Sequence, residues 1–145
     1  MRVSSILVLL PVYGAAVHAQ NNTTLPAPPP CVRTTPAPTE CNTEARFNEF
    51  ADSFLVTKNI TDAFTFIAAD YINHNPFVAN GSAAAWNVLS PIWPGLNITV
   101  FNTTFRGNMG WLNYTSDFGA VVDRFRWEGG CIVEHWDQNE TFPAN

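Results

Sequence analysis

The pattern of hydrophobic and polar residues divides the chain into a helical part and a later part with strand character. In "NTEARFNEFADSFLVTK", residues 42–58, apolar positions recur at i, i+3, i+4, i+7 and i+8, which predicts an amphipathic helix. A second helix is predicted from Thr61 to a point before Pro76, because proline disfavours helical backbone in the residue before it. Its apolar positions are Ala63, Phe64, Phe66, Ile67 and Tyr71. A third, shorter helix is predicted from Ser82 to about Leu89.

Beyond Pro94-Gly95, apolar and polar residues alternate, with many β-branched and aromatic side chains. The stretches "LNITVFNTTFR", "MGWLNYTS", "FGAVVDRFRW" and "CIVEHWDQ" predict four antiparallel strands. Helices followed by such strands define an α+β domain whose helices pack on one face of a sheet. Residues 20–40 are rich in proline and threonine and predict a flexible segment, so the folded domain is expected over residues 41–140, with a tail at 141–145.

The last predicted hairpin, "VVDRFRWEGGCIVEHWD", places ionisable residues among apolar ones. With residues 128–130 as a three-residue loop, Asp123 lies opposite His135 on the face that the helices cover. Arg124 then lies opposite Glu134 on the outer face, where the two form an ion pair. A shift of one strand by one residue would separate Asp123 from His135.

An aspartate beside a histidine in an apolar cavity is an arrangement for general acid–base catalysis. Asp123 and His135 are therefore candidate catalytic residues, and the alternative is a structural hydrogen bond that fixes the hairpin. His74, in "DYINHNP", is a third candidate at the mouth of the cavity. Its alternative role is a histidine at a helix end that interacts with the terminal carbonyls.

The expected substrate-binding residues are Tyr71, Asn73, Phe125 and Trp127. No metal is expected, because the histidines and aspartates lack the spacing of known metal sites. No cofactor is expected either, and no nucleotide-binding glycine motif is present.

The charge balance limits the partners of the protein. Seven Lys and Arg residues stand against twelve Asp and Glu residues, with a formal net charge of −5. No basic run or stripe is present, which argues against nucleic acid and anionic membranes as partners. The expected partner is a small-molecule ligand or substrate.

Residues 1–19 have the pattern of a secretory signal peptide: Arg2, an apolar run and the small-residue cleavage site Val17-His18-Ala19. The protein is therefore expected to be secreted or to lie in the lumen of the secretory pathway, with no membrane attachment after signal removal. Eight N-glycosylation sequons agree with this route. They begin at Asn21, Asn22, Asn59, Asn80, Asn97, Asn102, Asn113 and Asn139.

Three cysteines, Cys31, Cys41 and Cys131, predict one disulfide and one free thiol in an oxidising compartment. The sequence permits three pairings. We favour Cys41–Cys131, which would tie the first helix to the last hairpin.

The segments "DYINHNPFVANG" and "VVDRFRWEGGCIVEHWD" together resemble motifs of the SnoaL-like polyketide cyclase family, within the NTF2-like superfamily. The resemblance covers residues 44–138 and implies a cone-shaped α+β barrel. In such a barrel a curved antiparallel sheet packs on N-terminal helices and encloses a pocket. The resemblance also implies cofactor-free chemistry, with Asp123 as base, His135 as its partner or acid, and His74 as a third candidate. The chain departs from the family pattern at Cys131, where a basic residue usually follows the turn glycine.

Two functions are consistent with these residues. The first is a secreted cyclase or isomerase that uses aldol-type or proton-transfer chemistry on a carbonyl-containing small molecule, as in secondary metabolism. The alternative is a secreted, glycosylated module that binds a small ligand or dimerises without catalysis. A homodimer through the outer sheet face, with Ile132 and Trp136 as apolar surface, is compatible with either function.

Overall fold

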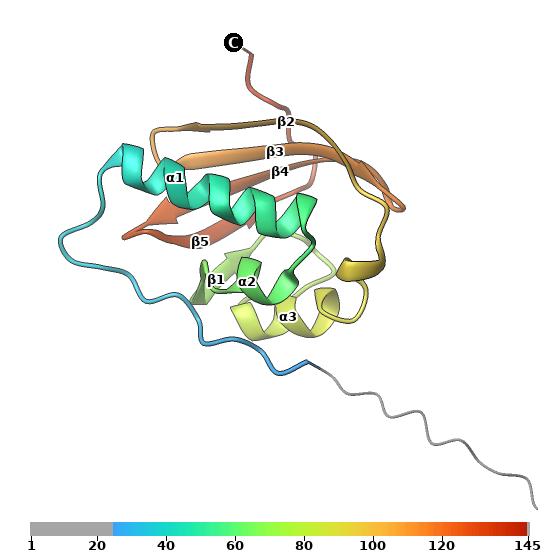
Figure 1. Ribbon diagram of the computed structural model, residues 1–145, viewed down its shortest axis with the longest axis horizontal. Coiled ribbons are helices and arrows are strands. Elements are labelled where there is room, and N and C mark those ends of the chain that lie inside the picture. Colours follow the sequence, from blue (N-terminus) through green and yellow to red (C-terminus); the bar gives the residue numbers. More distant parts are fainter. Residues whose placement is uncertain (1–24, 145) are drawn as a thin grey trace, which may run out of the picture.

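A curved five-stranded sheet and three α-helices form the domain in the computed structural model, which describes residues 25–144 (Figure 1). The helices are α1 (Glu40–Ala51), α2 (Ile60–Phe64) and α3 (Ser82–Leu89), with a π-helical turn η1 (Asp52–Val56) and a 3₁₀ turn η2 (Trp93–Gly95). The strands are β1 (Ile67–Asn73), β2 (Thr99–Arg106), β3 (Met109–Ser116), β4 (Gly119–Glu128) and β5 (Cys131–Trp136). The predicted signal peptide and the sequons at Asn21 and Asn22 lie outside the described residues.

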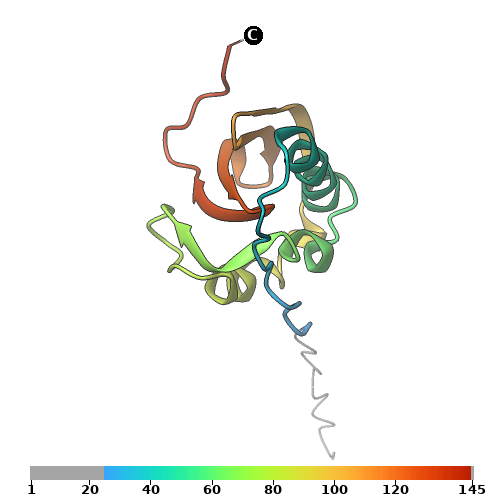
Figure 2. The ribbon, with the colours of Figure 1, turned by 90° about the vertical axis from the view of Figure 1, so that its left-hand side faces the viewer.

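The strands are arranged in the order β1-β5-β4-β3-β2. Neighbouring strands are antiparallel except β1 and β5, which pair in parallel. Seen from the side in Figure 2, the sheet curls strongly, but it does not close into a barrel. The α+β class is therefore confirmed, whereas the sheet is mixed and open instead of wholly antiparallel and closed.

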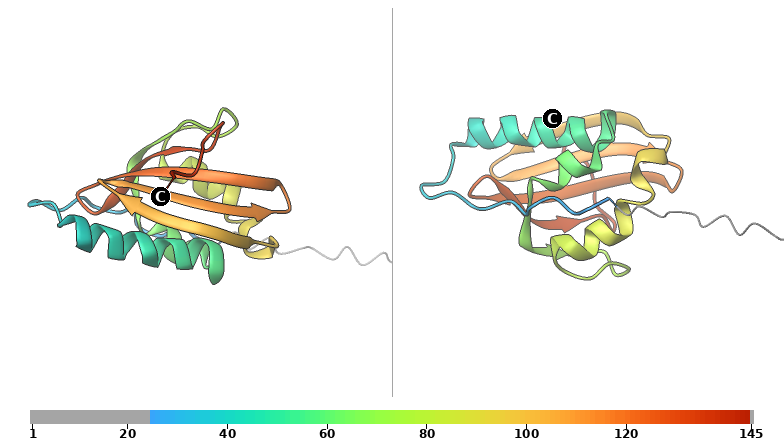
Figure 3. Two further views of the ribbon diagram at one scale, coloured as in Figure 1. Left: turned by 90° about the horizontal axis from the view of Figure 1, so that it is seen from above. Right: turned by 60° about the horizontal axis from the view of Figure 1, so that its bottom comes forward.

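Helix α1 confirms the first predicted helix and begins slightly earlier, where Thr39 Oγ1 accepts a hydrogen bond from the Asn42 backbone N–H at 3.2 Å. It runs alongside β2 and β3 (Figure 3) and buries Phe47 and Phe50 against the sheet. The ring of Phe47 covers Gly110 so closely that a Cβ atom there would lie 2.5 Å from it. The missing side chain of Gly110 therefore sets how closely α1 approaches the sheet.

The second predicted helix is only partly correct. Helix α2 ends at Phe64, and residues 67–73 form the edge strand β1. The backbone N–H of Ile132 donates to Phe66 O at 2.8 Å, and that of His74 donates to His135 O at 3.0 Å. Pairing with β5 therefore overrides the helical spacing of the apolar residues. The third helix, from Ser82 to Leu89, is confirmed.

The hairpin between β4 and β5 turns at Gly129-Gly130, so that Glu128 pairs with Cys131. Both glycines have positive φ angles, 56° and 82°, as a two-residue type I′ turn requires. The predicted three-residue loop is therefore wrong. This change alone would move β5 by one residue and place His135 on the outer face.

A β-bulge compensates for the shorter turn, because the register of the hairpin shifts at Val133. Beyond the bulge, His135 returns to the inner face and pairs with Phe125. The predicted direct pairing of His135 with Asp123 is thus wrong, although both residues lie on the same face. The two-residue turn also places Ile132 in the main core instead of on the predicted outer face, and Val133 lies in a separate small cluster.

The predicted ion pair between Arg124 and Glu134 is not formed. Glu134 accepts instead from Arg126 Nε, at 2.7 Å. Arg124 contacts Glu140 at 3.0 Å, and its guanidinium lies 4.3 Å from the ring centroid of Trp136. The shifted register explains both differences, since Arg126 is the residue that pairs with Glu134.

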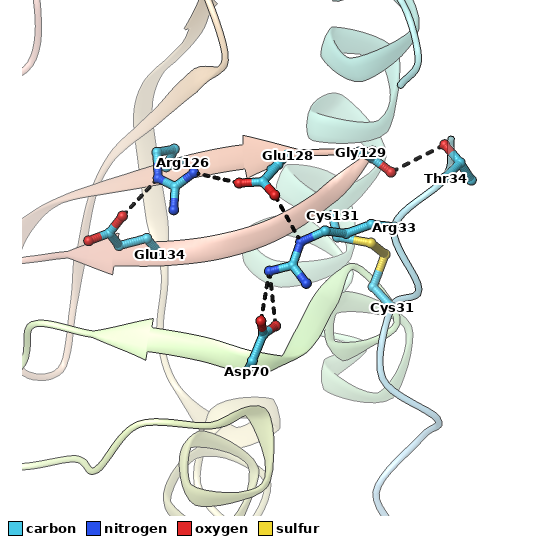
Figure 4. Close-up of polar contacts among 9 residues, drawn as sticks. All are labelled: Cys31, Arg33, Thr34, Asp70, Arg126, Glu128, Gly129, Cys131 and Glu134. Atoms are coloured by element: carbon cyan, nitrogen blue, oxygen red, sulfur yellow. Dashed lines mark hydrogen bonds and ion pairs between the residues drawn. A yellow bond between two sulfur atoms is a disulfide. The ribbon is translucent and has the colours of Figure 1, made fainter. Parts of the chain in front are cut away.

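The N-terminal strap (residues 31–34) is bound to the domain, in contrast to the flexible segment that its composition predicts (Figure 4). Cys31 donates its backbone N–H to Ile67 O at 2.9 Å, and Thr34 donates to Gly129 O at 3.0 Å. Arg33 forms ion pairs with Asp70 at 2.9 Å and with Glu128 at 3.5 Å. The strap therefore joins β1 to the β4–β5 hairpin.

The strap also corrects the predicted disulfide. Cys31 is bonded to Cys131, with a Cα–Cα distance of 5.7 Å, and the pairing of Cys41 with Cys131 is wrong. Cys41 is a free, exposed residue in the first turn of α1. The strap passes beside β1 and brings Cys31 next to the buried Cys131. Within residues 25–144, no helix combines the length and the apolar character needed to cross a bilayer.

Candidate functional site

A cavity of about 110 Å³ lies between the inner face of the sheet and the helices. One side of it is apolar and largely aromatic, and its residues include Phe50, Phe54, Phe64, Trp93 and Phe125. The polar residues gather on strands β1, β3, β4 and β5 and on the segments that follow them. They include Asn73, Asn75, Tyr114, Asp123, His135 and Asp137.

Asp123 and His135 form a hydrogen-bonded pair in the wall of this cavity. Asp123 Oδ1 lies 3.0 Å from His135 Nε2, and the side chains are only 5% and 12% exposed. The other oxygen, Oδ2, accepts a hydrogen bond from the Tyr114 hydroxyl at 2.8 Å. Burial raises the pKa of Tyr114 well above its ordinary value, and the neighbouring Asp123 adds to the shift, so this hydroxyl stays protonated and donates.

Asn73 determines where His135 carries its hydrogen. Asn73 Oδ1 accepts a hydrogen bond from the backbone N–H of Asn75 at 3.1 Å. This bond identifies the side-chain atom at that position as the amide oxygen and not the amide nitrogen. The same oxygen lies 3.1 Å from His135 Nδ1, which must therefore carry a hydrogen. Since two lone pairs cannot face each other at 3.0 Å, one further proton lies between His135 Nε2 and Asp123 Oδ1. The pair is either a carboxylate with an imidazolium or a carboxylic acid with a neutral imidazole.

The imidazole of His135 is held by aromatic rings on both sides. Phe125 stacks on it with a centroid distance of 4.7 Å, and the Tyr71 ring lies at 6.3 Å with an interplanar angle of 20°. Both rings also line the cavity. The acid–base pair is therefore fixed in orientation and borders the space that a ligand would occupy.

Asp137 and Asn75 lie at the same polar end of the cavity, just beyond β5 and β1. The Asn75 side-chain amide donates to Asp137 Oδ2. Neither lysine nor arginine lines this cavity in the described part of the chain. The pKa of Tyr71 is raised well above its ordinary value, first by burial and then by the charges of Asp123 and Asp137.

The structure does not bring His74 to the other candidate residues. Successive side chains of a strand point to opposite faces, so Asn73 points into the cavity and His74 lies outside it. His74 Nε2 lies 2.8 Å from Glu134 Oε1, and its ring stacks on Trp136 with a centroid distance of 4.8 Å. His74 is therefore part of an outer surface cluster.

The predicted substrate-binding residues Tyr71, Asn73 and Phe125 line the cavity, whereas Trp127 does not. Trp127 is 1% exposed in the core, in contact with Phe47. Four other residues that line the cavity were not predicted from the sequence: Asn75, Trp93, Tyr114 and Asp137. Of these four, only Tyr114 could have been predicted from a sequence pattern. The alternation in "MGWLNYTS" places it on the same sheet face as Leu112, which pairs with Asp123.

Three residues could together hold a metal ion. The ligand atoms of Asp123, His135 and Asp137 all lie within 4.8 Å of one another, and one imidazole with two carboxylates suits a divalent cation such as Zn²⁺. The bond from His135 Nδ1 to Asn73 is also typical of a metal-ligating histidine. Asp123 and His135 direct the same atoms at each other, so a cation would have to displace their shared proton.

Four of the predicted sequon asparagines in the described residues, Asn59, Asn80, Asn97 and Asn139, are exposed and lie in or beside loops. Asn102 is exposed on β2, and Asn113 is half-buried on β3, where the two residues pair with each other. These positions leave the predicted glycosylation open to test.

No family model matches the sequence, and no curated protein matches it. Solved structures do match. An NTF2-like protein of unknown function from Burkholderia xenovorans has 14% sequence identity and a TM-score of 0.56, with 73% of this chain and 89% of that chain covered. A LEH-like epoxide hydrolase from M. tuberculosis has 13% identity and a TM-score of 0.54, with coverage of 69% and 84%. AclR from Streptomyces galilaeus, provisionally assigned as a hydroxylase, has 17% identity and a TM-score of 0.54, with coverage of 68% and 89%.

These likenesses define the class of the protein. Its curved sheet, its N-terminal helices and its internal cavity form an NTF2-like fold, as the sequence motifs predicted. The LEH-like epoxide hydrolase is one protein with a similar fold.

Proposed function

We propose that the protein is a cofactor-independent cyclase or isomerase that moves a proton on a compact, carbonyl-containing small molecule. The observation that carries this proposal is the 3.0 Å contact between Asp123 Oδ1 and His135 Nε2 at the wall of a largely apolar cavity, from which we infer one shared proton. A carbon acid next to a carbonyl needs a base at the carbon and a donor at the oxygen, and this pair contains both.

In the proposed reaction, the Asp123 carboxylate takes the proton from the carbon next to the carbonyl and becomes a carboxylic acid. The two electrons of the broken C–H bond form the C=C bond of an enolate, and the π electrons of the carbonyl move onto its oxygen. The His135 imidazolium stabilises this oxygen or protonates it. Asp123 then returns its proton at a different carbon, or the enolate carbon attacks a second carbonyl and closes a ring, and the alkoxide that forms takes the proton from Asp123. The hydrogen bond from His135 Nδ1 to Asn73 keeps the reactive nitrogen directed at Asp123 and the cavity.

The cavity restricts the substrate. At about 110 Å³ it is smaller than the 300–1,000 Å³ of sites for drug-sized ligands. The aromatic side excludes water from the developing enolate, and this strengthens its interaction with the imidazolium. An LEH-like epoxide hydrolase has a similar fold, and this supports a catalytic role for the cavity.

The proposal is tested by deuterium exchange of small ketones, such as butanone and cyclopentanone, followed by NMR in D₂O. The wild-type protein should accelerate exchange next to the carbonyl, and Asp123→Asn should lower the rate by about 100-fold or more. Asp52→Asn is the matched control, because Asp52 is exposed and does not line the cavity. Unchanged exchange in a folded Asp123→Asn variant would show that the assigned base is wrong.

A binding module without catalysis is the second candidate. Both oxygens of Asp123 and both nitrogens of His135 already have partners within the protein, as a purely structural pair would. A protein that binds small ketones in this cavity but exchanges none of their protons would have this second function.

Secretion is part of the proposal. The Cys31–Cys131 disulfide is compatible with an oxidising compartment, in which the predicted signal peptide and sequons would be used. Expression of the full chain in a eukaryotic secretory host, followed by mass spectrometry of the medium, tests the use of the signal peptide and of the sequons. The expected product begins at Gln20 and carries N-linked glycans. Retention of the intact, unglycosylated chain inside the cells would contradict secretion.

A further inference from the structure

We propose that Asp137 makes the cavity selective for a small ligand with a protonated amino group and that it repels anionic ligands. The inference rests on the proposed function because it concerns the same cavity, and it names the class of molecule that this cavity accepts. It depends on ligand binding and not on turnover.

The net charge at the polar end of the cavity follows from the number of protons that its ionisable side chains hold. The Asp123–His135 pair holds one proton between the two residues and another on Nδ1, so its net charge is zero in both of its protonation states. Asp137 is then the one uncompensated charge among the lining residues, because no lysine or arginine of residues 25–144 lines the cavity. With Asp137 as a carboxylate, the lining residues therefore carry one net negative charge.

The partners of Asp137 hold its carboxylate without neutralising it. Oδ2 accepts from the Asn75 amide, and Oδ1 accepts from the Gln138 amide at 3.2 Å. Both donors are uncharged, and each carboxylate oxygen can accept a second hydrogen bond. An ammonium group on a ligand would supply the missing positive charge, and such charge-assisted bonds are about twice as strong as neutral ones.

The negative field extends to the aromatic side of the cavity. The charges of Asp123 and Asp137 both contribute, after burial, to the raised pKa of Tyr71. An anionic ligand would meet the same field, and no lysine or arginine of residues 25–144 lines the cavity to balance it. The structure therefore disfavours substrates with a free carboxylate or phosphate.

The remaining surface of the cavity suits a short hydrocarbon body. Phe54 and Trp93 stack with a centroid distance of 4.0 Å, and Trp93 lies 6.3 Å from Tyr114. The indole N–H of Trp93 is already bonded to Phe54 O, so this side offers no free donor. An engineered cavity of about 150 Å³ admits benzene, so a cavity of about 110 Å³ admits a ligand of about four to five non-hydrogen atoms.

The experiment uses three probes with one carbon skeleton: isobutylamine, isobutanol and isobutyrate. Each is titrated at neutral pH into the isotope-labelled, disulfide-bonded protein, and binding is followed by NMR shifts of the residues around the cavity. We expect isobutylamine to bind about tenfold more tightly than isobutanol, as one hydrogen bond to a charged group provides. Isobutyrate should produce no shifts in the cavity.

The variants Asp137→Asn and Asp52→Asn complete the test. Asp137→Asn should remove the preference for the amine over the alcohol, whereas Asp52→Asn should keep it. Two results with the wild-type protein would overturn the inference: equal binding of amine and alcohol, or tight binding of isobutyrate. Both can be measured even if Asp137→Asn does not fold. A preference for the amine that persists in a folded Asp137→Asn variant would also overturn it.

The two proposals fail in different ways. Selective amine binding without exchange of ketone protons contradicts the proposed catalysis and leaves the inference standing. Exchange of ketone protons without selectivity for amines contradicts the inference alone.

Discussion

Asp123 and His135 are diagonal neighbours on β4 and β5, with 3.0 Å between Oδ1 and Nε2. Phe125, and not Asp123, lies directly opposite His135. The contact exists because the bulge at Val133 turns His135 back to the inner face after the two-residue turn has moved it outward. The acid–base pair therefore depends on the length of β5 as much as on the two residues themselves.

Insertion of one alanine after Val133 should separate the pair. The bulge absorbs one extra residue, so a second one would move His135 opposite Arg124 and towards the outer face. Asp123 would then lose its partner, which costs about 3 kcal/mol or more for a buried charge. The ring ¹⁵N shifts of His135 should change to those of a solvated histidine, and the free energy of unfolding should fall in urea titrations. Val133→Ala keeps the chain length and should retain the His135 shifts. Retention of those shifts after the insertion would contradict the role of the bulge.

The stability of the protein should fall at alkaline pH. Burial raises the pKa of Tyr71 and of Tyr114 well above the ordinary value, whereas both titrate near pH 10 in the unfolded chain. Above about pH 10 the native state therefore holds more protons, so the free energy of unfolding decreases by up to ~1.4 kcal/mol per pH unit for each tyrosine.

Urea titrations at several pH values, together with absorbance at 295 nm, measure this loss. Tyr114→Phe should reduce the pH dependence by about half, because one of the two tyrosines is removed. Ionisation of both tyrosines near pH 10 in the folded protein would contradict the expectation.

Removal of the Cys31–Cys131 disulfide should destabilise the domain strongly. The bond closes a loop with a sequence separation of 100, for which the chain-entropy model predicts about 4.7 kcal/mol. The double variant Cys31→Ser, Cys131→Ser should therefore lose about 4 kcal/mol in urea titrations. Cys41→Ser is the control, with a change within about 0.5 kcal/mol because Cys41 is exposed and free. Equal stability of the double variant and the control would refute the structural role of the bond.

Gly110→Ala should destabilise the packing of α1. The new Cβ atom would lie 2.5 Å from the ring of Phe47, which is fully buried and cannot move without displacing its neighbours. Overpacking of this kind costs about 1–3 kcal/mol. Gly95→Ala is the matched control, because a Cβ atom there meets nothing within 4 Å. Thermal unfolding of both variants measures the difference, and equal melting temperatures would disagree with the observed contact.

The sequence predicted those elements whose residues follow one period without interruption. The helix from Ser82 to Leu89 and the strands beyond Pro94 are of this kind. Strand β1 is different, because its pairing with β5 is interrupted between Ile67 and Ile72. Its buried residues Ile67, Ala68 and Tyr71 therefore lack strict alternation and fall at helical spacing.

The candidate site was partly predictable for a related reason. The inner face of Asp123 follows from alternation along β4, but the position of His135 depends on a turn and a bulge whose one-residue effects cancel. The sequence thus predicted the correct sheet face for Asp123 and His135 but the wrong register between β4 and β5. Asn75 and Asp137 lie outside regular elements, so no periodic pattern indicated that they line the cavity.

The disulfide also changes what a protease can do to this protein. The bond joins position 31 to position 131, and the chain between them contains every helix of residues 25–144 and most of the sheet. A single cut within that stretch, for example in the exposed segment around Phe77, would leave the two pieces covalently joined. Such a nicked molecule would keep its halves together and would separate into two fragments only after reduction.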